Sequence, residues 1–156
     1  MRKSYVRTAF GLACAAIVML FAGTALADHS GYKVVDGLTV YYGVIPAAVL
    51  RTFPKGSPEA RAHARIPSGK HTYHLVVAVF EGDSMERVTD AQVTVRVKET
   101  GLGWIKKHLE PTTLNDAVTY CNYFTFYDHA TYTLDIDVRR PGPTATVTAE
   151  FEYRNY

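Results

Sequence analysis

The sequence has 156 residues, of which 47% are hydrophobic and 12% aromatic, and its formal net charge is +2. This length is sufficient for one domain with a sizeable core. The small net charge gives no concentrated basic face of the kind that binds nucleic acid, so no nucleic-acid partner is expected.

The first 27 residues have the features of a secretory signal peptide. Three basic residues lie within the first seven positions, an apolar run follows over residues 9–22, and residues 25–27 (Ala-Leu-Ala) suit a signal peptidase. The apolar run is shorter than the roughly 20 residues that a membrane-spanning helix needs. We therefore predict cleavage after Ala27, a periplasmic location without a membrane span, and one mature domain over residues 28–156.

Seven segments have the composition or the period of β-strands. In chain order they cover residues 38–45, 73–80, 91–98, 104–109, 122–127, 131–140 and 144–153. The third and the last two alternate apolar and polar residues, which predicts one face in a core and one in water. The second is apolar on both faces, which predicts a central strand covered on both sides. No segment has a sustained helical period, so we predict an all-β fold, an immunoglobulin-like antiparallel β-sandwich of about seven strands.

A long loop interrupts this pattern at residues 53–70, where three prolines and two glycines occur with few large apolar residues. A loop of this length inside a compact domain is usually functional or mobile. It also brings His63 close in sequence to His71 and His74.

His63, His71 and His74 fall within twelve positions and are candidate ligands of a transition-metal ion, copper or iron. Residues three apart on a strand point to opposite faces. If the strand begins after His71, His74 points with Val76 and Ala78, and one ion binds both histidines only if the chain bends between them. In the alternative, one histidine caps the loop by hydrogen bonds and the other lines the sheet.

Three other features leave alternatives open. After cleavage Cys121 is the sole cysteine. It can serve as a small buried hydrophobic residue, as a thiolate ligand of a metal ion, or as the disulfide bridge of a homodimer. A chain that begins Asp28-His29 can also chelate Cu(II) through its terminal amine. Ten tyrosines remain in the mature chain, and they form a binding face or fill the core.

Catalysis has no support in the sequence, which contains neither a Gly-x-Ser-x-Gly elbow nor a His-Glu-x-x-His motif. We therefore expect a protein that is not an enzyme.

Several segments resemble a family of small bacterial periplasmic β-sandwich proteins. They are residues 36–46 (DGLTVYYGVIP), 88–97 (VTDAQVTVRV), 120–123 (YCNY) and 150–153 (EFEY). Members include the periplasmic iron- and copper-binding partners of iron permeases, and residues 88–97 are also similar to FixH-like and YtkA-like domains. The resemblance implies a periplasmic β-sandwich that works beside an inner-membrane metal transporter.

The metal ligands of that family do not carry over to this chain. The resemblance places methionine and histidine ligands after Pro111 and before Tyr120, where this chain has Thr112, Thr113 and Thr119. We therefore predict metal binding through His71, His74 and His63 instead. The alternative function is a periplasmic interaction module that binds a protein partner through its tyrosine-rich face.

Overall fold

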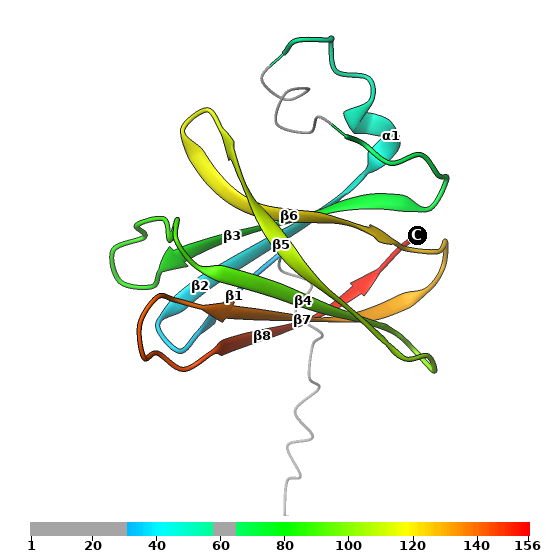
Figure 1. Cartoon of the computed structure of the whole chain (residues 1–156). Coiled ribbons are helices and arrows are strands. Elements are labelled where there is room, and N and C mark those ends of the chain that lie inside the picture. Colours follow the sequence, from blue (N-terminus) through cyan, green and yellow to red (C-terminus); the bar gives the residue numbers. More distant parts are fainter. Residues whose placement is uncertain (1–30, 58–64) are drawn as a thin grey trace, which may run out of the picture.

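The structure is a computed structural model that describes residues 31–57 and 65–156. In this part of the chain the strands are antiparallel and form one sheet, in the order β1-β2-β3-β6-β5-β4-β7-β8. They are β1 (Tyr32–Val35), β2 (Leu38–Pro46), β3 (Thr72–Glu81), β4 (Gln92–Glu99), β5 (Trp104–Leu114), β6 (Ala117–Thr125), β7 (Thr131–Arg139) and β8 (Val147–Arg154). The sheet folds over itself into two facing layers that nearly close into a barrel (Figure 1). The predicted immunoglobulin-like antiparallel β-sandwich is confirmed, with eight strands.

Strand β5 connects the two layers. Its residues 104–109 pair with β4 of the second layer (β4, β7 and β8), whereas residues 110–114 pair with β6 of the first layer (β1, β2, β3 and β6). The backbone pairing between β5 and β6 ends at Glu110 and Cys121. Beyond this point, side chains of the two strands donate hydrogen bonds to backbone carbonyls of the other strand. Asn122 Nδ2 donates to the carbonyl of His108 (2.8 Å), and Lys107 Nζ donates to the carbonyl of Tyr123 (2.6 Å). The sheet therefore divides without leaving these two acceptors unpaired.

The core lies between the layers and is built by the predicted alternation. Val93, Val95 and Val97 of β4 point inward and are buried, as are four alternate residues of β7. Those four are Tyr132, Leu134, Ile136 and Val138. Each fully buried aliphatic side chain of this kind contributes roughly 1.5–3 kcal/mol to folding. The polar partners of these residues lie on the outer faces, as expected for strands with one side in water.

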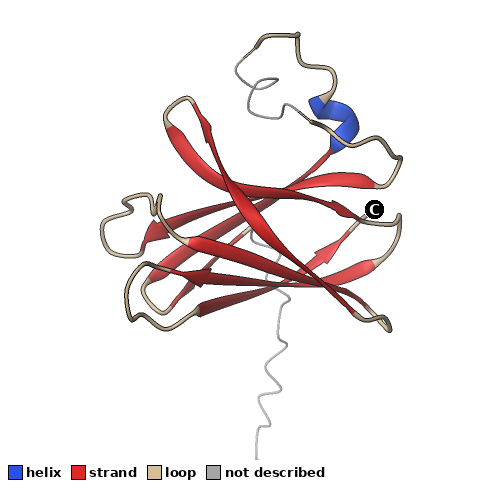
Figure 2. Cartoon of the chain, viewed as in Figure 1, coloured by secondary structure: helices blue, strands red, loops and turns tan. Residues whose placement is uncertain are grey.

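Strand β3 differs in part from its prediction. Its inward residues Leu75, Val77 and Val79 are completely buried. Its outward residues Val76 and Ala78 are only half-buried, so the strand is not fully covered on both sides. Two short elements were also not predicted: β1, which has four residues, and the single-turn helix α1 (Ala47–Leu50), which packs against β2 and β3 (Figure 2).

The connections gather at two ends of the sandwich, which Figure 1 shows at the right and the left. The first, here called the histidine end, holds residues 47–57, 65–71, 100–103, 126–130 and 155–156. The opposite end holds residues 36–37, 82–91, 115–116 and 140–146. No helix among the described residues is long and apolar enough to cross a membrane.

An aromatic cluster closes the core at the histidine end. Phe126 is completely buried and its ring meets those of Tyr132 and Tyr153 edge-on, with centroids 4.9 and 5.0 Å apart. The ring of Tyr73 contacts Phe126 in the same way at 5.8 Å. Edge-to-face contacts of this kind stabilise by about 0.5–1.5 kcal/mol each beyond their buried area. They hold the loop at residues 126–130 against the end of the barrel.

Candidate functional site

The structure gives His71 and His74 separate surroundings. His71 directly precedes β3, and His74 is the third residue of that strand. His74 lies on the outer face of the first layer with Val76 and Ala78, as predicted, whereas His71 lies beside the loop at residues 126–130. His63, the third predicted ligand, lies outside the described residues.

His74 is buried, with 1% of its surface exposed. It pairs with Ile45 of β2 on one side and with Tyr123 of β6 on the other. The rings of His74 and Tyr123 are tilted against each other, with centroids 4.9 Å apart. This position corresponds to the sequence alternative in which one histidine lines the sheet, and the predicted metal role of His74 stays a prediction.

Cys121 lies on the same outer face. It is two residues before Tyr123 in β6 and pairs with Val76 of β3. Burial raises the pKa of the Cys121 thiol; a hydrogen bond with Thr112 (Sγ to Oγ1, 3.1 Å) opposes that change and the nearby Glu110 adds to it. Burial likewise raises the pKa of Tyr123, as does the nearby sulfur, while Arg51 lowers it. At neutral pH the thiol therefore stays protonated, which suits a small buried hydrophobe and disfavours nucleophilic chemistry. A disulfide-linked homodimer stays a prediction, and it would first require this buried sulfur to become exposed.

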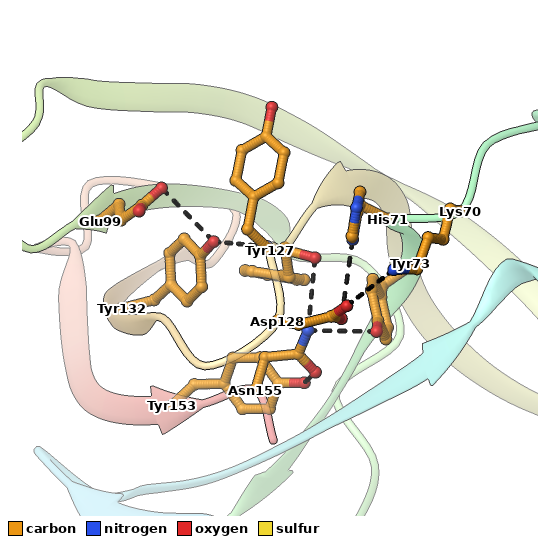
Figure 3. Close-up of polar contacts among 10 residues, drawn as sticks. Lys70, His71, Tyr73, Glu99, Tyr127, Asp128, Tyr132, Tyr153 and Asn155 are labelled. Carbon is orange, nitrogen blue, oxygen red and sulfur yellow. Dashed lines mark hydrogen bonds and ion pairs between the residues drawn. The ribbon is translucent and has the colours of Figure 1, made fainter.

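His71 forms a charged group with two neighbours. Asp128 Oδ2 accepts from Lys70 Nζ at 3.1 Å, and Asp128 Oδ1 lies 3.6 Å from His71 Nδ1 (Figure 3). The hydrogen bond from Lys70 is the main reason that the pKa of Asp128 is lowered, and the charges of Lys70, His71 and His129 act in the same direction. The carboxylate is therefore ionised at neutral pH and faces one ring nitrogen of His71.

Next to this group, a polar network ties the C-terminus to the aromatic cluster. Asn155 Nδ2 donates to Tyr73 Oη (3.1 Å) and to the carbonyl of Phe126 (3.3 Å), and Tyr153 donates to Asn155 Oδ1 (3.1 Å). Figure 3 shows this network directly beside Asp128 and His71. Sequence reasoning missed Asn155 and Asp128, since both lie in short polar segments after strands and resemble ordinary loop residues.

A second arm of the same network involves Tyr132. The backbone N–H of Tyr127 donates to Tyr132 Oη (2.7 Å), and this hydroxyl lies 3.5 Å from Glu99 Oε2. Burial raises the pKa of Tyr153 to about 12, and the neighbouring hydroxyls of Tyr73, Tyr42 and Tyr132 act in the same direction. Burial also raises the pKa of Tyr132, so the hydroxyls of Tyr132 and Tyr153 are neutral at physiological pH and serve as hydrogen-bonding groups.

Among the described residues, no three His, Cys, Asp or Glu side chains converge as metal ligands. Two hollows of about 230 and 240 Å³ lie at the opposite end of the sandwich, and both are bordered by Arg140. Arg140 also forms an ion pair with Glu81 there. These hollows are remote from the histidines, so the histidine end remains the candidate site.

Comparisons with known proteins bear on the fold. No protein-family model matches the chain, and no curated protein matches it. A crystal structure of a DUF4426 family protein from Pseudomonas aeruginosa is 18% identical, with a TM-score of 0.64, over 80% of this chain and 93% of that one.

Two copper-bound proteins also have similar structures. A copper-bound variant of FetP from uropathogenic Escherichia coli is 10% identical, with a TM-score of 0.58, over 81% of this chain and 94% of its own. A copper-bound variant of the Campylobacter jejuni protein P19 is 9% identical, with a TM-score of 0.58, over 80% and 93% of the two chains. At these identities the likeness establishes a shared fold. The similarity to FixH-like and YtkA-like domains is not tested by these structures and stays a prediction.

Proposed function

We propose that this chain is a secreted periplasmic accessory protein of transition-metal handling, which binds a copper or iron ion beside an inner-membrane transporter. The observation that supports this most is the fold shared with two copper-bound proteins over about four fifths of the chain. The leader-like residues 1–27 support the periplasmic location. The proposal is for a binding protein and includes no catalytic step.

His71 is the histidine whose surroundings best suit a metal ligand. Asp128 is ionised and faces Nδ1 of the ring. A carboxylate on one ring nitrogen orients a histidine and leaves Nε2 for a metal ion. About a third of the side chain is exposed, so an ion can reach it. We therefore propose that His71 binds through Nε2.

His74 and His63 complete the proposed ligand set. His74 is buried beside Tyr123, so it joins the same ion only if the chain between the two histidines bends. Copper and iron both accept imidazole ligands, and geometry decides between them in a site of this kind. The two described histidines therefore need to be tested separately.

The test is the metal content of the mature protein, exported to the periplasm and purified without chelator or affinity tag. We expect about one equivalent of copper or iron by mass spectrometry, a loss in His71→Ala, and a weaker binding in His74→Ala. His108→Ala is the matched control, because His108 is exposed on β5 at the outer face of the second layer. Absence of metal in the purified protein, with no uptake of Cu(II), Fe(II) or Zn(II) on titration, would exclude the proposal.

The alternative is an interaction module that binds a protein through exposed tyrosines. On the outer face of the first layer Tyr32 stacks on Tyr41 (centroids 5.1 Å apart), and Tyr41 meets Phe80 edge-on at 5.5 Å. This function predicts a partner that co-purifies with the exported protein whether or not chelator is present. Tyr32→Ala and Tyr41→Ala would remove the partner, whereas His71→Ala and His74→Ala would not.

A further inference from the structure

Exposed apolar side chains are unevenly distributed over the described residues. Of the ten large hydrophobic residues that are clearly exposed, seven lie at or next to the histidine end, whereas Met85 and Val34 lie at or next to the opposite end. Four of the seven are Val49, Phe53, Tyr127 and Tyr156. Of the other three, Leu102 lies in the turn between β4 and β5, and Trp104 and Ile105 are the first two residues of β5. Exposed apolar clusters of this kind mark interaction sites.

These three residues form an apolar tip at the end of the β4–β5 hairpin, here called the 100–105 tip. Leu102 is 60% exposed, Trp104 45% and Ile105 52%. The tip projects because β5 has left β6 there and pairs only with β4. Figure 1 shows it at the lower right, extending beyond the rest of the second layer. No described segment packs over it.

Cationic side chains lie directly behind this tip. Lys98 pairs with Trp104 across the hairpin, and its Nζ lies 5.4 Å from the centre of the indole ring. Lys106 is exposed two residues further along β5. Successive residues advance about 3.3 Å along a strand, so Lys106 lies some 3–7 Å behind Ile105 and Trp104, whereas Lys98 is level with Trp104.

Charge is also divided between the two ends of the molecule. When the strand residues that border each end are counted with it, the histidine end has two acids, Glu99 and Asp128, among six cations: Arg51, Lys55, Arg65, Lys70, Lys98 and Arg154. The opposite end carries three cations, Arg87, Arg139 and Arg140, among six acids: Asp36, Glu81, Asp83, Glu86, Asp90 and Asp116. Among the described residues, the histidine end is therefore both apolar and basic, whereas the opposite end is acidic. Such a field orients the molecule toward an anionic surface.

We propose that the histidine end docks onto the surface of an anionic phospholipid bilayer, with the 100–105 tip entering the interface. Trp is favoured at the boundary between headgroups and hydrocarbon, and Lys is favoured at anionic headgroups. Apolar faces enter such interfaces by about 5–10 Å, a depth that takes in the apolar tip and leaves Lys106 near the headgroups. The docking is independent of metal binding and goes beyond the proposed function.

The arrangement of the tip favours a bilayer over a protein partner. Trp104 and Ile105 are successive residues of a strand, so their side chains lie on opposite faces of the hairpin. A flat protein surface contacts one face of such a hairpin, whereas a fluid interface surrounds both. The other cations of the histidine end also suit a broad anionic surface.

Trp104 is the sole tryptophan of the chain, so its fluorescence reports on the tip directly. The mature protein would be mixed with vesicles of phosphatidylglycerol and phosphatidylcholine, or of phosphatidylcholine alone. We expect a blue shift of Trp104 emission and co-sedimentation with the anionic vesicles only, weakened by salt.

The double variant Leu102→Ser, Ile105→Ser, which keeps Trp104 as the reporter, should weaken partitioning roughly tenfold or more. Lys98→Gln and Lys106→Gln should each weaken it about fivefold.

Met85→Ser is the matched control, since it removes an exposed apolar residue at the opposite end and should leave partitioning unchanged. Circular dichroism of each variant establishes that it is folded. Three results would overturn the proposal: no shift and no co-sedimentation with anionic vesicles, partitioning that survives the Leu102→Ser and Ile105→Ser changes, or a blue shift that depends on protein concentration without lipid. The last would assign the tip to contacts between copies of the chain.

Discussion

Asn155 is a buried amide that joins three segments distant in sequence. Besides its bonds to Tyr73, Phe126 and Tyr153, its backbone pairs with Ala130 and His129, which fixes the loop beside His71. Asn155→Ala leaves buried groups without partners, so we expect the free energy of unfolding to fall by roughly 1–3 kcal/mol. Urea denaturation measures it. Tyr156→Ala, at the neighbouring exposed residue, should change stability by less than about 0.5 kcal/mol.

The raised pKa of Tyr153 makes the fold sensitive to alkali. Its pKa is about 12 in the folded protein against 10.0 ordinarily, because burial disfavours the phenolate. The folded state thus holds this proton more tightly, and the stability it contributes is complete below pH 10 and lost as the pH rises toward 12. We expect the free energy of unfolding to fall over this interval, and to fall less steeply in Tyr153→Phe. Urea unfolding at several pH values, followed by tyrosinate absorbance, tests this; equal slopes for both proteins would contradict it.

The candidate site was predictable from the sequence only as far as local geometry reaches. The strand period alone placed His74 with Val76 and Ala78, and it separated His71 from them. The pairing of His71 with Asp128 depends on β6 returning beside β3, a contact across more than fifty residues. No local pattern encodes such a contact, so the neighbours of His71 appeared only in the structure.

At the scale of elements, two side chains bond to backbone carbonyls where the sheet divides at β5. Lys107→Met keeps an apolar side chain but removes both the donor to the carbonyl of Tyr123 and the ammonium group that lies over the ring of Phe124. We expect a loss of roughly 1–3 kcal/mol in the free energy of unfolding, and faster hydrogen exchange in the last residues of β6. Lys106→Met is the control, because Lys106 is the neighbouring lysine of β5 and is exposed on the outer face of the second layer. Equal stability of the two variants would show that the division needs no such bond.

The same division explains the main errors in the strand predictions. The segment at residues 104–109 was predicted to stop before Pro111, yet β5 continues to Leu114. A proline is tolerated there because β4 no longer pairs with β5, so one side of the strand is an open edge. β1 was missed because its four residues are too few to show a period. The longer strands with clear alternation were predicted correctly.

At the scale of the whole molecule, the sequence predicts that the working protein is shorter than the encoded chain. We expect the exported form to begin at Asp28, since residues 25–27 suit a signal peptidase. Intact-mass measurement and N-terminal sequencing of periplasmic protein test this. A product that retains residues 1–27 would place the protein at the membrane by its leader instead. It would also remove the amino-terminal Asp28-His29 copper hypothesis.

The sharing of β5 between the layers has a consequence for how quickly the chain folds. The β4-β5-β6 meander needs only two short turns. In contrast, β3 meets β6 and β4 meets β7 through residues far apart in sequence: Val76 and Cys121 are 45 residues apart, as are Val93 and Val138. Closing such long loops costs entropy before any contact is gained. We expect the meander to nucleate and the distant closures to limit the rate, in the millisecond-to-second range of β-sandwiches. Substitutions in β5 should then slow folding, while those in β8 should mainly speed unfolding.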